Sequence, residues 1–295
     1  MAAVSSPPLV SLKNILVATD FSPCSQIALH CAAVLARQAK GNVFLAHVLP
    51  FAPLSPIPMD SGPVFPVAVG SDPRFRMKQM VSSPELAGIE SKTLLGQGDL
   101  WLVLQGMIEQ NDIDLVVIGT HGREGLKKLV LGSLAEEVFR RAPCPVVTVG
   151  PHVASECFEQ GRLRRVLFAS DLSPSSMHAL PFVTMLAQHQ ASLTFLHVVA
   201  SAVPNAEIDT AAFVASEVDE ARESLRQFVP AGSDADVVVE VGIPGEVIVR
   251  VARAQNASLI VMGLHLQSVF AATHLPWTTA HRVVCDAHCP VMTVR

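Results

Sequence analysis

The sequence lacks an apolar run that approaches the roughly 20 residues of a membrane-spanning helix. This is notable because its 295 residues are 50% hydrophobic and only 16% charged, with a mean hydropathy of +0.41. Parallel sheets covered by helices on both faces explain such a composition without a bilayer. Residues 1–14 also lack a basic stretch followed by an apolar one. We therefore expect neither a secretory leader nor a membrane partner.

Cysteine is scarce and scattered, which disfavours a disulfide framework in a chain of this length. The pattern is typical of free thiols in a reducing cytoplasm, so we expect a cytoplasmic protein. The six positions are Cys24, Cys31, Cys144, Cys157, Cys285 and Cys289.

Positive charge is also in short supply, since the net charge is −5, and this argues against nucleic acid as the main partner. Residues 1–150 carry 12 Lys and Arg against 12 Asp and Glu. Residues 151–295 carry 9 against 14 and contain no lysine. An anionic ligand should therefore be better tolerated in the first half.

Familiar catalytic motifs are missing as well. The chain contains neither a G-x4-G-K-[ST] phosphate loop nor a G-x-S-x-G nucleophile turn. Phosphoryl transfer also needs a positioned base and usually a metal ion. The sequence identifies no catalytic residue, so any ATP hydrolysis is expected to be slow or absent.

A glycine-punctuated loop between a strand and a helix is the most informative feature that is present. Residues 115–118 form a solid apolar run, as in a buried parallel strand, and Gly119 ends it. Gly122 follows, and Gly132–Ser133 opens a helical pattern. Glycines let backbone N–H groups approach an anion closely, and a helix start offers unpaired N–H groups. Together with the basic Arg123 and Lys127–Lys128 on the loop, this pattern favours phosphate binding over a bare strand–helix connection.

The rest of the first half reads as alternating strands and helices. We expect strands at residues 14–18, 42–49, about 89–95, 115–118 and 145–149. Ser22–Pro23 starts a helix that ends before Gly41. Further helices are expected at about 74–87, from the segment 97–100 to near 111, and from Ser133 onward. A proline-rich connection, residues 50–73, separates the second strand from the helix that follows it.

The second half repeats the first. Residues 14–23 return as 165–174, residues 44–48 as 194–198, residues 115–121 as 259–265, and residues 142–149 as 287–294. This is a tandem duplication of a five-strand unit. We therefore expect a first domain at residues 1–150, a linker at 151–163 and a second domain at 164–295.

The repeat keeps the first glycine of the loop, Gly263, but loses the others. Leu266 stands where Gly122 stood, Trp277 replaces Gly132, and Thr278 replaces Ser133. These side chains should obstruct the approach of a phosphate. We expect one binding half and one degenerate half.

Taken together, the Asp after the first strand, the His-Val at the end of the second, the G-x2-G-x9-G-S loop and the Ala-Pro-Cys-Pro-Val segment resemble the universal stress protein family. The resemblance covers the whole chain as a tandem pair. It implies two Rossmann-like α/β domains, each with a five-stranded parallel sheet of order 3-2-1-4-5 flanked by helices. It also implies that members with the intact glycine loop bind ATP, while those without it often do not.

Carried over by position, the resemblance also implies a set of site residues for an adenine nucleotide. Ala18, Thr19 and Asp20 would lie beside adenine and ribose, and Val48 would present its backbone to the adenine edge. The residues expected to line the phosphates are Gly119, His121, Gly122, Gly132, Ser133 and Leu134. The physical argument agrees, since open α/β sheets bind ligands where the strand order reverses.

Several of these residues have structural alternatives. Asp20 could bind ribose hydroxyls or help to hold Mg²⁺, or it could only form a turn, as its repeat Asp171 suggests. His121 could contact a phosphate or brace the loop, since His265 repeats it. Lys127–Lys128 reads better as a solvated face.

A zinc-like spacing occurs at His281, Cys285, His288 and Cys289. Because Cys289 repeats Cys144, which has no partner ligands, packing explains it better, and no metal site is expected.

Three functions remain open at this point: an ATP-binding regulatory protein of the stress-response type, a weak ATPase or phosphotransferase, and a nucleotide-free interaction scaffold. The first is favoured. The last strands of the halves, residues 145–149 and 290–294, should pair as an intrachain pseudo-dimer, because each would otherwise be an unpaired sheet edge. Further pairing of two chains into a homodimer is left open.

Overall fold

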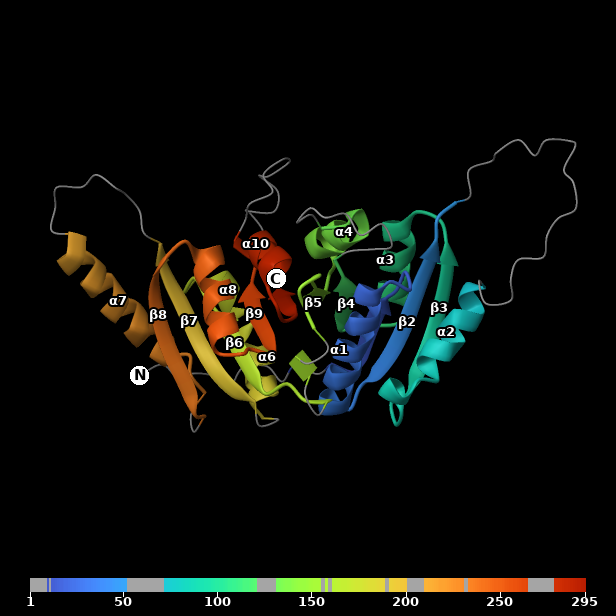
Figure 1. The fold of residues 1–295 in the computed structure, drawn as a ribbon, viewed down its shortest axis with the longest axis horizontal. Coiled ribbons are helices and arrows are strands. Elements are labelled where there is room, and N and C mark those ends of the chain that lie inside the picture. The colour runs from blue at the N-terminus through green and yellow to red at the C-terminus, as the bar shows by residue number, and fades with distance from the viewer. Residues whose placement is uncertain are drawn as a thin grey trace, which may run out of the picture.

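The computed structural model describes residues 10, 12–51, 72–120, 131–154, 157–158, 161–188, 191–200, 210–230, 233–264 and 279–295. It confirms the predicted α/β class. One sheet of ten strands runs through both halves in the order β3-β2-β1-β4-β5-β10-β9-β6-β7-β8 (Figure 1). Each half therefore has the predicted order 3-2-1-4-5, and the two halves meet at their last strands.

The first half contains five parallel strands, namely β1 (Asn14–Ala18), β2 (Asn42–Leu49), β3 (Ser91–Gln97), β4 (Leu115–Gly119) and β5 (Val146–Val149). Its helices are α1 (Pro23–Ala39), α2 (Pro73–Val81), the short 3₁₀ helix η2 (Pro84–Leu86), α3 (Leu100–Gln110) and α4 (Ser133–Arg141). The strands β1 and β4 are buried almost throughout, as their apolar runs predict.

The second half repeats this order with β6 (Arg165–Ala169), β7 (Ser192–Ala200), β8 (Ala235–Gly242), β9 (Leu259–Gly263) and β10 (Val291–Val294). Its helices are α5 (Pro174–Met177), α6 (Leu180–Ala187), α7 (Thr210–Arg226), α8 (Pro244–Ala254) and α10 (Thr279–Asp286).

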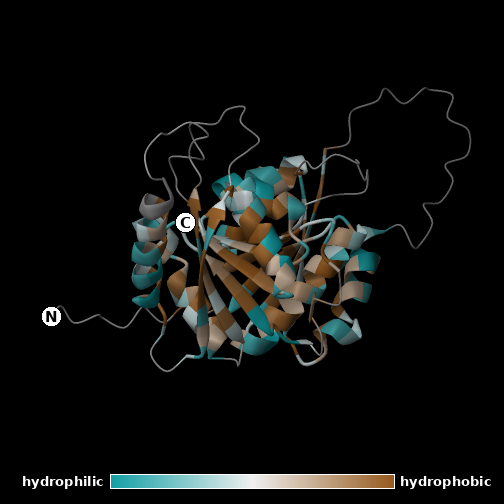
Figure 2. Cartoon of the chain, turned by 60° about the vertical axis from the view of Figure 1, so that its left-hand side comes forward, coloured by the Kyte–Doolittle hydropathy of each residue, from teal (hydrophilic) through white to brown (hydrophobic). Residues whose placement is uncertain are grey.

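The helices cover both faces of the sheet. One apolar cluster joins α1, α2, α6 and α7 to one face, and a second joins α3, α4, α8 and α10 to the other. Figure 2 shows hydrophobic residues concentrated on the strands and hydrophilic residues on the outer sides of the helices. This is the layered arrangement that the high apolar content predicts.

The halves join through the antiparallel pairing of β5 with β10, in which Met292 lies opposite Val147. The hydroxyl groups of Thr148 and Thr293 donate reciprocally to Val291 O and Val146 O, at 3.2 and 3.3 Å. The strand pairing predicted from the sequence is therefore present. All other strand pairs of the described residues are parallel.

The helix expected at residues 74–87 was predicted too long. It ends at Val81, and η2 follows after two serines. Pro84 disfavours helical geometry in the residue before it, which explains the break. The third strand, expected at about 89–95, is displaced to Ser91–Gln97. The repeat of α1 is also broken, because Pro181 cannot donate a helical hydrogen bond and two short helices, α5 and α6, replace one long helix.

Candidate functional site

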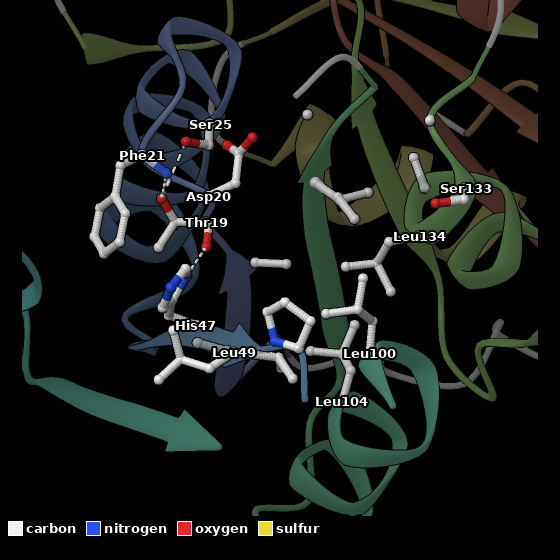
Figure 3. Close-up of a pocket in the computed structure, with 18 of the residues that line it drawn as sticks. Thr19, Asp20, Phe21, Ser25, His47, Leu49, Leu100, Leu104, Ser133 and Leu134 are labelled. Carbon is white, nitrogen blue, oxygen red and sulfur yellow. Dashed lines mark hydrogen bonds between the residues drawn. The ribbon is translucent and has the colours of Figure 1, made fainter. Parts of the chain in front are cut away.

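A cavity of about 700 Å³ opens at the carboxyl ends of β1, β2 and β4 in the first half. Since β1 pairs with β2 on one side and β4 on the other, this is the point where the strand order reverses. The first turn of α4 and the N-terminal turns of α2 and α3 complete the wall. Figure 3 shows labelled side chains from the turn after β1 and from β2, α3 and α4 around the same space.

Eight of the eleven predicted site residues line this cavity. They are Ala18, Thr19, Asp20, Val48, Gly119, Gly132, Ser133 and Leu134. The other three, His121, Gly122 and Arg123, lie outside the described residues, as do Lys127, Lys128 and, in the second half, Leu266, Trp277 and Thr278. The degenerate loop of the second half therefore stays a prediction.

The turn after β1 is held by a compact hydrogen-bond network. Asp20 Oδ1 accepts from Ser22 N at 3.0 Å, and Phe21 N donates to Thr19 Oγ1 at 3.0 Å. The hydroxyl groups of Thr19 and Ser25 lie 3.0 Å apart. Phe21 takes a left-handed conformation with φ of 66°, which is unusual for a bulky residue. The network fixes the position of Asp20 in the lining of the cavity.

Burial alone would raise the pKa of Asp20, but hydrogen bonds from Ser22 and Ser25 outweigh it, and the pKa lies below its ordinary value. The carboxylate is therefore charged at neutral pH. A charged, half-buried carboxylate can accept hydrogen bonds from hydroxyl groups or bind a cation.

His47, at the end of β2, braces the same turn from the other side. Its Nδ1 lies 2.6 Å from Thr19 O, and its ring centroid lies 4.5 Å from that of Phe21. His47 and Phe21 thus form one continuous wall of the cavity.

The start of α4 is the feature best suited to a phosphate. Ser22 and Asp99 cap the starts of α1 and α3 with their side chains, but Gly132, before α4, has no side chain to do so. The first N–H groups of a helix have no partner inside it, and they carry the positive end of its dipole. Ser133 adds a hydroxyl beside them. This end of the cavity therefore favours an anion.

The two described glycines of the loop have different reasons to be glycine. A Cβ on Gly119 would lie 3.1 Å from Cys24 in α1, and one on Gly263 would lie 2.3 Å from Ser176 Cα in α5. The first glycine of the motif therefore permits close strand–helix packing in both halves. Gly132 donates to Thr120 O at 2.8 Å, and its Cβ would lie 3.2 Å from the same oxygen, so it brings the far end of the loop back to the end of β4.

Sequence reasoning missed part of the cavity wall. Leu100 and Leu104 of α3 and Pro50 after β2 supply an apolar surface, and Arg76 of α2 supplies a cation. The spacing of Leu100 and Leu104 on one helix face is visible in the sequence. Arg76 carries no local signal, because it reaches the cavity only through tertiary packing.

The zinc-like spacing of His281, Cys285, His288 and Cys289 gains little support as a metal site. The Sγ atom of Cys285 lies 3.9 Å from Nδ1 of His281. Within the described residues no group of three or more His, Cys, Asp or Glu side chains is arranged to hold a metal ion. Burial raises the pKa of the Cys285 thiol to about 11, so this thiol is protonated at neutral pH.

No helix of the described residues is long and apolar enough to cross a membrane.

Comparison with solved structures supports the fold over the full length. A Pseudomonas aeruginosa protein of unknown function matches with a TM-score of 0.63 and 18% identity, covering 96% of this chain and 92% of the other. A universal stress protein from Archaeoglobus fulgidus matches with a TM-score of 0.60 and 19% identity, covering 97% of both chains. At these identities the likeness concerns the fold.

Comparison of sequences identifies the family. A universal stress protein of Methanocaldococcus jannaschii is 28% identical over 138 residues, which are 46% of this chain and 81% of that protein. Universal stress protein A homolog 1 of Coxiella burnetii is 31% identical over 146 residues, which are 46% of this chain and 95% of that protein. The model of the universal stress protein family matches twice, at residues 11–150 and 162–295. The chain therefore belongs to the universal stress protein family, with two tandem domains of that type.

Proposed function

We propose that the chain binds one adenine nucleotide, with ATP as the expected ligand, in the cavity of its first half, and that occupancy of this site regulates a stress response. The observation that carries the proposal is the convergence of eight predicted site residues on one cavity. In this arrangement the ribose lies beside Asp20, and the phosphates lie at the start of α4. Regulation would follow if nucleotide binding favours one conformation or interface over another.

The chemistry of the cavity fits the parts of a nucleotide. The uncapped first turn of α4 offers backbone N–H groups to phosphates. Leu100, Leu104 and Pro50 offer an apolar wall to a base. Asp20 is the one carboxylate among the described lining residues, and a Mg²⁺ ion that arrives with ATP needs only one or two carboxylates besides phosphate and water.

We propose binding without appreciable turnover. The lowered pKa of Asp20 makes it a weak general base. A weak ATPase remains the alternative, and a turnover assay on the same samples separates the two.

Isothermal titration calorimetry of the full chain with ATP tests the proposal, and we expect a stoichiometry near one. The chain contains a matched pair of variants. Asp20→Ala and Asp171→Ala each remove an equivalent hydrogen bond, because Asp171 Oδ1 accepts from Ser173 N at 3.0 Å. Only Asp20→Ala should weaken ATP binding, by about tenfold for a lost hydrogen bond to a charged group.

Three outcomes contradict the proposal. A stoichiometry near two would show that the second half also binds. Equal effects of the two variants would show that the turn, and not the carboxylate, accounts for any loss. Absence of ATP, ADP and AMP binding to folded protein would favour the interaction scaffold instead.

A further inference from the structure

The two halves contain the same turn after their first strand, which separates what the fold requires from what it does not. Leu172 takes φ of 62°, close to the 66° of Phe21. Leu172 N donates to Ser170 Oγ at 3.0 Å, and the hydroxyl groups of Ser170 and Ser176 lie 2.9 Å apart, as in the first half. His197 Nδ1 lies 2.9 Å from Ser170 O, matching His47. The turn therefore needs neither an aromatic ring nor a cation.

The first half adds both. Phe21 stands where the second half has Leu172, and the guanidinium of Arg76 lies over the Phe21 ring, 4.1 Å from its centroid. The planar guanidinium of such a stack keeps its N–H edge free to donate. Because folding of the turn does not require this stack, we infer that the stack serves to bind a ligand.

Arg76 is equipped to contact a ligand. It is half-buried and lines the cavity, and no other Arg or Lys of the described residues lines it. Its side chain has no hydrogen-bond or ion-pair partner within the described part of the chain. The neighbouring Arg74 is exposed and does not line the cavity. A guanidinium presents five donors in a planar fork that matches the oxygens of a phosphate.

The cavity thus has two sites of positive potential on different walls. Figure 3 shows Phe21 on one side of the cavity, Ser133 and Leu134 on the other, and Asp20 between them. The start of α4 supplies one site and Arg76, over Phe21, supplies the other. A nucleotide with its 5′ phosphates at α4 and its ribose at Asp20 directs its 2′ and 3′ oxygens away from α4. These oxygens then face the wall of the cavity that Phe21 and Arg76 form.

On the basis of the proposed nucleotide site, we propose that Arg76 recognises a phosphate carried on the ribose 2′ or 3′ oxygen, while the other ribose hydroxyl donates to Asp20. The preferred ligand is then an adenine nucleotide phosphorylated on its ribose as well as at its 5′ position. Arg76 is then a specificity-determining residue. The Phe21 ring holds its guanidinium in place, and the α4 start binds the 5′ group independently.

The test compares three probes that differ only in the ribose phosphate: AMP, adenosine 2′,5′-bisphosphate and adenosine 3′,5′-bisphosphate. Calorimetry with the full chain should show one of the bisphosphates binding about tenfold more tightly than AMP, the gain expected from one charge-assisted pair of hydrogen bonds. In Arg76→Gln this gain should disappear while the affinity for AMP stays within about twofold. Arg74→Gln, on the same helix, is the matched control and should keep the full gain.

A second variant tests the stack. Phe21→Leu copies the second half, whose turn has the same conformation, so the protein should fold. The AMP affinity of this variant is the reference for its bisphosphate gain. It should lose part of the bisphosphate gain, because nothing then holds the guanidinium over the turn. Circular dichroism of each variant establishes that the fold is intact.

The outcomes separate this inference from the function it rests on. If AMP and ATP bind but neither bisphosphate binds more tightly, or if Arg76→Gln leaves the gain intact, the inference is wrong and the nucleotide site stands. If no adenine nucleotide binds at all, both are wrong. If a bisphosphate binds and ATP does not, the ribose phosphate is the determinant and ATP is not the ligand.

Discussion

At the scale of single residues, Asp20 combines a structural and a proposed binding role. Its hydrogen bond to Ser22 recurs at Asp171 in the other half, so the turn alone accounts for an Asp at this position. What the turn does not require is that the carboxylate lines a cavity, as Asp20 does in the first half. The matched variants proposed above separate these roles because only Asp20 has a predicted ligand beside it.

The pH dependence of stability offers a first prediction at this scale. An Asp whose folded-state pKa is lowered adds stability that is fully present above its unfolded-state pKa, about 3.9, and is lost as the pH falls through the lower folded value. Asp20→Asn keeps an oxygen for Ser22 N but carries no charge. We expect urea unfolding between pH 6 and 2.5 to show a smaller loss of stability below about pH 4 in the variant. Parallel profiles would show that Asp20 is not responsible.

The lining residues that the sequence predicts differ from those it does not predict in what determines their position. Ala18, Asp20, Gly132 and Ser133 sit at the ends of elements, where local patterns determine their position. Arg76 contacts Phe21, but it follows the connection at residues 50–73, and no local pattern predicts where the chain after this connection packs. Burial and contact between distant segments decide its role, and they become visible only in the folded chain.

At the scale of elements, α4 connects the cavity to the junction of the halves. Its first turn lines the cavity, and Phe139 O, in its last turn, accepts a hydrogen bond from Nη2 of the C-terminal residue Arg295. A change at the start of α4 can therefore reach the second half through this one helix and its contact with Arg295.

The second prediction concerns the start of this helix. Gly132→Trp, which copies the other half, should weaken ATP binding by about a hundredfold, the loss of two charge-assisted hydrogen bonds, because the indole occupies the phosphate position. Gly132→Ala is the control: its Cβ, 3.2 Å from Thr120 O, needs only a small shift, and it should keep most of the affinity. Calorimetry measures both. Undiminished binding by a folded Gly132→Trp would place the phosphates elsewhere.

Element boundaries show how far pattern reasoning extends. Apolar runs located the strands because the buried parallel strands of both halves have few polar positions. The end of α2 at Val81 and the break before α6 escaped because single prolines, Pro84 and Pro181, outweighed an otherwise helical pattern. Local backbone chemistry thus overruled periodicity at both positions.

At the scale of the whole molecule, the central strands should be the most stable part of the structure. Both β5 and β10 are hydrogen-bonded on two sides and fully buried, whereas β3 and β8 are the outer strands and are partly exposed. Amide exchange requires opening of the structure, so it is slowest where opening disturbs most contacts.

The third prediction follows from this difference. Hydrogen-exchange mass spectrometry of the full chain should show peptides that contain Val147 and Met292 among the slowest to exchange, and peptides from β3 and β8 clearly faster. The edge strands serve as an internal control within the same sample. Exchange at Met292 as fast as in β8 would mean that the halves separate in solution and that the continuous sheet is not their stable state.

The antiparallel joint between β5 and β10 has a consequence for how the chain can change over generations. In a dimer of identical subunits every substitution appears twice, so neither copy can alter its loop while the other keeps it. Here one polypeptide contributes both sides of the joint, and each side is encoded separately. One half can thus retain its glycines while the other exchanges them for leucine and tryptophan, with the shared sheet left intact.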